Sequence, residues 1–117
     1  MNRLRINAKA ASDIDTEALF IANQFGVERG IKFYDACETA FDQLLTYPQI
    51  GKVRKFPNIA IDIRRWQVKG FAEYLIFYRL WSVEQNNDRS YTVEVLRIIH
   101  GSRDLETLFQ GEFEEVE

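Results

Sequence analysis

The chain has 117 residues, of which 46% are hydrophobic and 14% aromatic, and its formal net charge is −3. A chain of this size can bury a core as one domain without disulfides or a metal, and its single cysteine, Cys37, excludes an internal disulfide framework. No apolar run approaches the roughly 20 residues of a membrane span, and the N-terminus lacks the apolar core of a signal peptide. We therefore expect one cytoplasmic domain over residues 1–117.

The first half of the chain predicts a short strand followed by two helices. Residues 3–7 alternate polar and apolar side chains, as a short strand does. Either Asn7 or Ser12 can cap the first helix, which ends at Gly26 because glycine is a natural helix stop. Apolar residues recur at helical spacing again over 27–46, so the two helices form a hairpin.

One face of this hairpin is expected to lie buried on a sheet. The residues expected in that layer are Ile14, Ile21, Phe25, Phe33, Phe41 and Leu44. The apolar stripe of the second helix consists of Val27, Ile31, Tyr34, Phe41 and Leu45, widened by Phe33, Cys37, Ala40 and Leu44. Cys37 is interpreted as a buried apolar side chain rather than a nucleophile. Because nine phenylalanines are many for this length, some are expected on an exposed surface that binds a partner.

The second half predicts a meander of three strands. Its expected elements are a basic loop over 51–58, strands over 59–66, 72–81 and 91–99, and a polar loop over 85–89. Strands joined by short turns pair antiparallel, and the unbroken apolar run 75–77 indicates a central strand buried on both faces. The predicted fold is α+β: an N-terminal helical hairpin packed on a twisted antiparallel sheet of three to four strands, with the N-terminal strand at its edge.

Charge is distributed unevenly along the chain. Residues 10–47 hold seven acids and two bases, whereas residues 51–70 hold six bases and one acid. Residues 112–117 form an acidic tail with four acids and no base. A basic segment can meet an acidic partner, while the net negative charge argues against broad affinity for nucleic acid. A solvated surface of mixed charge would give the same pattern.

Two motifs hold most of the residues that can do chemistry. The first, RRWQVKGF over 64–71, combines arginines with a tryptophan. The second, VLRIIHGSRD over 95–104, ends a buried strand at a turn that contains the only histidine. Together with the strand YLIFYR between them, in this order and at this spacing, they resemble the ParE branch of the ParE/RelE toxin superfamily, over roughly residues 3–109. These proteins are the toxin halves of bacterial type II toxin–antitoxin systems, and the resemblance favours Asn7 as the helix cap.

The resemblance implies a toxin that inhibits DNA gyrase by protein–protein contact and is not itself an enzyme. It also implies a cognate antitoxin that wraps an extended or helical segment over the sheet and hairpin, and contact with operator DNA only through that antitoxin. The candidate partner-binding residues are Arg64, Arg65, Trp66, Lys69, Arg97 and Arg103. No cofactor is expected, and no metal, because a lone histidine without spaced ligands supports a metal site poorly.

The alternative is a ribosome-dependent mRNA endonuclease of the RelE type, with His100 as general base and Arg97 and Arg103 as phosphate-binding groups. The competing structural interpretation is that His100 fixes the turn and that Arg103 forms an ion pair nearby. RelE-like ribonucleases also carry a cation near position 74 and a tyrosine near position 109, where this chain has Tyr74 and Phe109. RNA cleavage needs a base, an acid and stabilisers of the developing charge. We therefore predict no ribonuclease activity; a degenerate member that only binds antitoxin is a third possibility.

Overall fold

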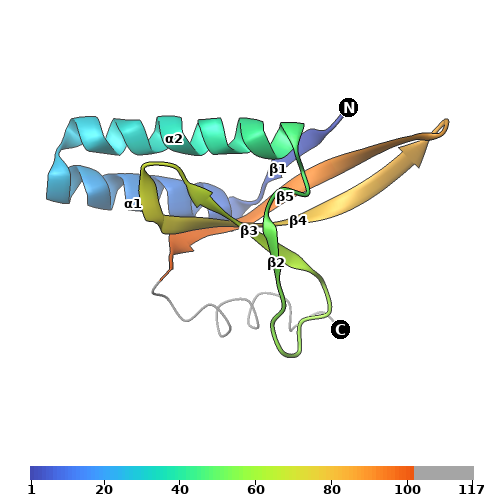
Figure 1. Cartoon of the computed structure of the whole chain (residues 1–117). Coiled ribbons are helices and arrows are strands. Elements are labelled where there is room, and N and C mark those ends of the chain that lie inside the picture. Colours follow the sequence, from blue (N-terminus) through green and yellow to red (C-terminus); the bar gives the residue numbers. More distant parts are fainter. Residues whose placement is uncertain (102–117) are drawn as a thin grey trace.

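The chain folds as two helices packed on one face of a five-stranded mixed sheet, as the computed structural model shows for residues 1–101, the part of the chain that it describes (Figure 1). The elements are β1 (Arg3–Ile6), α1 (Ala8–Phe25), α2 (Val27–Thr46), β2 (Lys52–Arg54), β3 (Ile63–Val68), β4 (Phe71–Gln85) and β5 (Asp88–His100). The strand order is β1-β5-β4-β3-β2. The predicted α+β class and helical hairpin are confirmed, with five strands in place of three to four.

Two features of the sheet differ from the prediction. The N-terminal strand β1 pairs with β5 in parallel, so the sheet is not wholly antiparallel. The predicted basic loop contains β2, which pairs antiparallel with β3. Lysine and arginine are poor indicators of a strand, and β2 has only three residues, so its composition gave no strand signal.

Both helix boundaries at the ends of α1 follow from capping residues. Asn7 caps α1 in preference to Ser12, because its side chain accepts the Ala10 N–H at 2.8 Å. Gly26 ends α1 with a φ of 106°, a conformation that other residues rarely adopt, and its N–H donates to the Ala22 carbonyl. The predicted helix stop at Gly26 is confirmed, and of the two caps that the sequence left open, the one favoured by the resemblance is used.

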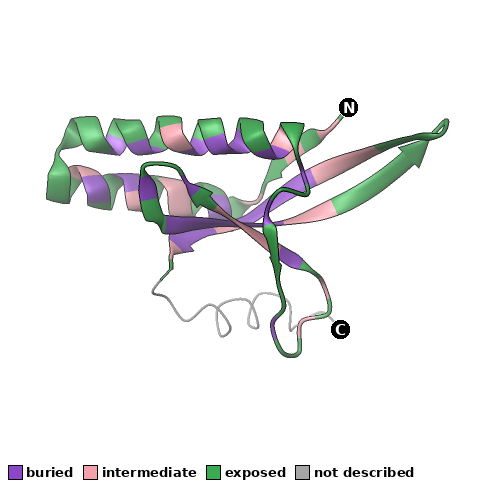
Figure 2. Cartoon of the chain, in the orientation of Figure 1, coloured by how far each residue is buried: buried purple, intermediate pink, exposed green. Residues whose placement is uncertain are grey.

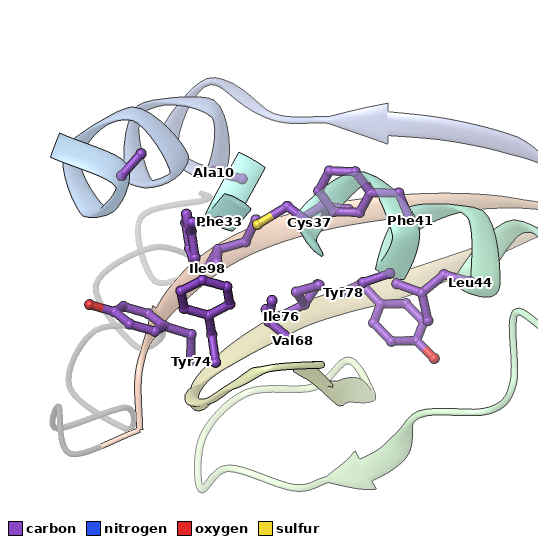
Figure 3. Close-up of a cluster of buried hydrophobic side chains, with 14 of the residues drawn as sticks. Ala10, Phe33, Cys37, Phe41, Leu44, Val68, Tyr74, Ile76, Tyr78 and Ile98 are labelled. Atoms are coloured by element: carbon purple, nitrogen blue, oxygen red, sulfur yellow. The ribbon is translucent and has the colours of Figure 1, made fainter. Parts of the chain in front are cut away.

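The main core lies between the helical hairpin and the sheet (Figure 3). Its centre is an aromatic group in which Phe33 of α2 meets the edges of Phe71 and Tyr74, with ring centroids 5.2 and 5.1 Å apart. Of the residues predicted for this layer, Ile21, Phe33, Phe41 and Leu44 are buried and Ile14 is half-buried. Cys37 is also buried, as predicted.

Part of the predicted buried stripe was wrong. Phe25 is 71% exposed, and Val27, Ile31 and Tyr34 are exposed as well. The turn between the helices projects beyond the end of the sheet (Figure 1), and Phe25 beside it only borders a cavity that Phe71 and Tyr74 of β4 also line. The stripe through Phe33, Cys37, Ala40 and Leu44 faces the core instead.

A second, smaller core lies on the opposite face of the sheet. Its buried members are Phe56, Ile63, Leu75, Phe77, Leu96 and Ile99. Ile59 and Ile61 pack against it from the segment that precedes β3, and β3 begins at Ile63 rather than at the predicted Ile59. The central strand β4 is therefore buried on both faces between Leu75 and Phe77, as its sequence predicted.

Strands β4 and β5 extend further than predicted and form a two-stranded arm, defined here as residues 79–91. Pairing of β3 with β4 ends at Tyr78, and pairing of β1 with β5 begins at Thr92. The predicted polar loop shrinks to a turn at Asn86 and Asn87, whose positive φ values of 53° and 67° are typical of a tight hairpin. The outer part of the arm is exposed on both strands (Figure 2).

Candidate partner-binding surface

A basic cleft of about 560 Å³ lies along β2, β3 and the end of α2. Three cations line it, Lys52, Arg65 and Lys69, and no acidic side chain does so among residues 1–101. Trp66 forms one wall and is held there because its indole N–H donates to Gln43 Oε1 of α2 at 3.1 Å. The cleft therefore offers positive charge beside an aromatic wall of fixed orientation, a combination that suits an acidic chain segment with apolar side chains.

Arg64 faces away from this cleft and organises a turn. Its guanidinium donates to the carbonyls of Gln49 and Gly51 at 3.1 and 2.8 Å. The same turn is held by Tyr78, whose buried hydroxyl donates to the Pro48 carbonyl and accepts the Gly51 N–H, both at 2.8 Å. Arg64 thus fixes the segment that leads into β2.

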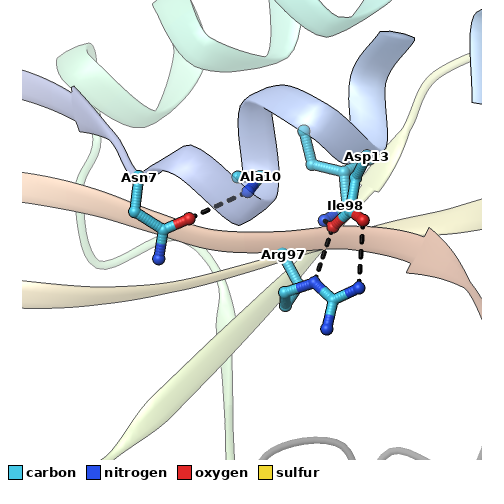
Figure 4. Close-up of polar contacts among 5 residues, drawn as sticks. All are labelled: Asn7, Ala10, Asp13, Arg97 and Ile98. Atoms are coloured by element: carbon cyan, nitrogen blue, oxygen red, sulfur yellow. Dashed lines mark hydrogen bonds and ion pairs between the residues drawn. The ribbon is translucent and has the colours of Figure 1, made fainter. Parts of the chain in front are cut away.

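Arg97 forms a two-pronged ion pair with Asp13 of α1 (Figure 4). Its Nε and Nη2 atoms lie 2.7 and 3.0 Å from the two carboxylate oxygens. Asp13 also accepts the backbone N–H of Ile98 at 3.0 Å, just beyond the point where β1 stops pairing with β5. The side chains of Arg97 and Asp13 are only 12% and 13% exposed, so this contact fastens α1 to the edge of the sheet.

Helix α1 also binds Tyr74, through Glu17, which lies one helical turn after Asp13. The Tyr74 hydroxyl donates to Glu17 Oε1 at 2.9 Å, and burial, followed by this hydrogen bond, raises the pKa of Tyr74 above its ordinary value. The ring of His100 packs edge-to-face on Tyr74, with centroids 5.4 Å apart. His100 and Tyr74 line a small cavity of about 360 Å³ between α1 and β4.

A second candidate surface is a groove of about 680 Å³ between α1, α2 and β1. Both apolar and acidic side chains line it, and it is called here the acidic groove. Leu4, Ile14 and Phe41 lie along it, and Asp15, Glu38 and Asp42 are the acids that line it. Tyr34 crosses toward α1 and donates to Asp15 Oδ1 at 2.6 Å. Cys37 also lines the groove, but burial raises its pKa to about 12, so the thiol stays protonated and unreactive at neutral pH.

The predicted site residues separate into three places. Arg65, Trp66 and Lys69 come together in the basic cleft, Arg64 lies behind it, and Arg97 lies at α1. Arg103, Phe109 and the acidic tail lie outside the described residues. The motifs missed Lys52 and Gln43, which join the cleft only through strand pairing and helix packing. None of the helices described is long and apolar enough to cross a membrane.

Comparisons with known proteins find similarity to a protein family and to solved structures. A family model described as "ParE toxin of type II toxin-antitoxin system, parDE" matches residues 4–105. A solved structure from P. aeruginosa, titled "Chromosomal ParDE TA system", superposes with a TM-score of 0.62 at 19% sequence identity, covering 86% of this chain and 96% of that chain. At this identity the superposition shows a shared fold. A search of curated proteins gives no significant match.

Proposed function

Because the chain belongs to the ParE toxin family of type II toxin–antitoxin systems, we propose that it inhibits DNA gyrase by protein–protein contact and is neutralised by a cognate antitoxin. Gyrase acts on the bacterial chromosome, so the proposal also places the protein in the cytoplasm. The remaining support argues against RNA cleavage, because side chains at positions that a ribonuclease would use for catalysis are bound to helix α1 instead.

The structural observation behind this proposal is that carboxylates of helix α1 bind the side chains at two positions that an RNA-cleaving centre would need. Asp13 and Glu17 lie one helical turn apart and bind Arg97 and Tyr74 respectively. Arg97 is therefore already neutralised by a carboxylate, and the Tyr74 hydroxyl already donates its proton to Glu17. A phosphate would have to compete with a buried, two-pronged ion pair, which argues against transition-state stabilisation by Arg97.

The two surfaces suggest how an antitoxin binds. Asp42 lines the acidic groove and the next residue, Gln43, lines the basic cleft, so the two sites meet across the C-terminal part of α2. A single partner segment that crosses α2 can therefore reach both. Charge complementarity requires basic residues where it enters the groove and acidic residues where it reaches Lys52, Arg65 and Lys69. An amphipathic helix leading into an extended stretch fits this order.

Supercoiling assays with purified components test the proposal. The toxin alone should inhibit gyrase, an equimolar amount of antitoxin should restore supercoiling, and ribosome-bound mRNA should stay intact. Codon-specific mRNA cleavage that His100→Ala or Arg97→Ala abolishes would instead establish the endonuclease alternative. Antitoxin binding without either activity would identify a degenerate toxin.

Charge reversal tests the antitoxin surface separately. Lys69→Glu should weaken antitoxin binding and make it less sensitive to salt, because one favourable long-range interaction becomes repulsive. Arg89→Glu makes the same change of charge on the arm, away from the cleft, and serves as the matched control. Equal effects of the two variants would show that overall charge, and not the basic cleft, governs binding.

A further inference from the structure

The basic cleft holds three positive charges that no carboxylate of residues 1–101 neutralises. Lys52 and Arg65 lie directly opposite each other where β2 pairs with β3, and Lys69 follows the last residue of β3. Like charges at directly opposed positions destabilise a sheet. Within residues 1–101 no ion pair joins any of these cations to an acid, and Lys52 and Lys69 are exposed. An anionic group in the cleft would therefore relieve a repulsion between these side chains.

The described part of the chain ends beside this cleft. The Gly101 N–H donates to the Glu73 carbonyl at 2.8 Å, and a Cβ at Gly101 would lie only 3.3 Å from Leu75 Cδ1. Leu75 also lines the basic cleft. Residues 102–111 separate Gly101 from the acidic tail, and a chain of this length can span up to about 35 Å. The tail is therefore within reach of the whole cleft.

The acidic tail complements the cleft in charge and in apolar character. Residues 112–117, with the sequence EFEEVE, carry four carboxylates and no cation, together with Phe113 and Val116. The segment 51–70, which contains all three cations of the cleft, holds six bases and one acid. Trp66 offers the apolar side chains of the tail an aromatic wall, held in place by Gln43. An acidic segment that contains apolar residues is the kind of ligand that this cleft suits.

We propose that the acidic tail docks in the basic cleft of its own chain and competes there with acidic segments of other proteins. Exposed ion pairs are individually weak and are screened by salt. Attachment to the same chain offsets this weakness, because it holds the tail at an effective concentration on the order of millimolar. The contact is therefore partial and sensitive to salt, and a partner that binds the cleft more tightly displaces the tail.

Paramagnetic relaxation in NMR spectra tests the contact in the full chain without any partner. Val116→Cys supplies a site for a neutral nitroxide label, whereas Cys37 is buried and stays unlabelled. At low salt the label should broaden the amide signals of Lys52, Arg65 and Lys69 far more than those of the acidic groove. The difference should shrink as the salt concentration rises. Broadening centred on another surface, or no broadening within residues 1–101, would overturn the proposal.

Charge variants distinguish a docked tail from one that merely lies near the cleft. Neutralising the tail keeps the length of the chain and should remove most of the broadening in the cleft; the substitutions are Glu112→Gln, Glu114→Gln, Glu115→Gln and Glu117→Gln. Lys69→Glu should have the same effect from the side of the cleft. Arg89→Glu, the matched control on the arm, should leave the broadening unchanged. Equal broadening with the charged and the neutral tail would show that charge does not hold the tail there and would overturn the proposal.

The effect on antitoxin binding rests on the proposed function, because it assumes that the antitoxin uses the same cleft. If the tail fills the cleft in about two thirds of the molecules, neutralising it should tighten antitoxin binding about threefold at low salt. The gain should vanish at high salt and in the Lys69→Glu background. No gain despite broadening in the cleft would contradict the proposed antitoxin surface and leave the tail contact established. A gain without broadening in the cleft would overturn the tail contact.

Discussion

The inner and outer halves of the β4–β5 hairpin share one antiparallel backbone pairing, but the inner half is buried and the outer half is exposed to solvent. The inner half, around Leu75 to Tyr78, is buried between two cores, whereas β4 is exposed on both faces from Trp81 to Gln85. Their sequences differ accordingly: consecutive apolar residues fill the inner half, and Trp81, Ser82, Val83 and Glu84 alternate in the outer half. Backbone pairing alone therefore continues the hairpin, while side-chain burial decides which part of it stabilises the fold.

The largest expected effect comes from the inner half. Phe77→Ala should lower the free energy of unfolding by about 3–5 kcal/mol, the usual cost of truncating a buried phenylalanine, because Phe77 is fully buried. Val83→Ala on the outer half should change it by no more than about 0.5 kcal/mol. Urea denaturation at low protein concentration measures both. Similar losses for the two variants would show that the arm contributes to the core.

The end of the inner half depends on one hydroxyl group. Tyr78→Phe should lower the free energy of unfolding by about 1–3 kcal/mol, since it leaves the buried Gly51 N–H and the Pro48 carbonyl without this partner. Tyr47→Phe removes a hydroxyl from a side chain that is 63% exposed and is the control. If both variants unfold at the same urea concentration, the turn at residues 48–51 is not held by Tyr78.

Between the two halves, Glu94 accepts hydrogen bonds from Trp81 and Arg79. Burial alone would raise the pKa of Glu94, but these two hydrogen bonds, together with the positive charges of Arg79 and Arg5, outweigh it and lower the pKa. A lowered pKa in the folded state means that the ionised group stabilises the protein above its ordinary pKa, and that this stability is lost as the pH falls through the folded-state value. Glu94→Gln should therefore cost about 1–2 kcal/mol at pH 7.

The same variant gives a test by pH. The difference in unfolding free energy between the wild type and Glu94→Gln should narrow as the pH falls below the ordinary pKa of a glutamate and through the lowered folded-state pKa, where the wild-type carboxylate becomes protonated. Urea denaturation at pH 7 and in steps down to pH 3 measures the difference. A constant difference over this range would mean that the charge of Glu94 does not stabilise the base of the arm.

Local sequence signals predicted most of the fold. Gly26 marked the end of the first helix, and the apolar run at Leu75 identified the central strand, whereas local signals left Asn7 and Ser12 open as helix caps. The parallel pairing of β1 could not be predicted, because it depends on contacts such as that of Asp13 with Arg97, 84 residues away in the sequence. The exposed side of Phe25 was missed because helical spacing shows which residues share a face but not how far the sheet extends beneath them.

The candidate site was predicted less completely. Basic residues around Trp66 pointed to a partner surface, and Arg65 and Lys69 do share one cleft. Lys52 reaches this cleft because it pairs with Arg65 across β2 and β3, a register that the predicted loop could not reveal. The acidic groove likewise needs residues from three elements, and its acids were visible in the sequence only as a net charge over residues 10–47.

The smallest predicted effect concerns the turn at the tip of the arm. Asn86 and Asn87 both have positive φ, where asparagine is tolerated and Asn-Gly is the preferred pair. Asn87→Gly should therefore stabilise the outer half by a few tenths of a kcal/mol without altering the inner half. Hydrogen exchange measures the two halves separately. Amides of residues 82–91 should exchange more slowly in the variant, while amides of residues 75–78 keep their rates. This difference is expected because the arm opens without global unfolding. Slower exchange in both halves would mean that the hairpin opens as one cooperative unit, and the contrast between its halves would then be limited to burial.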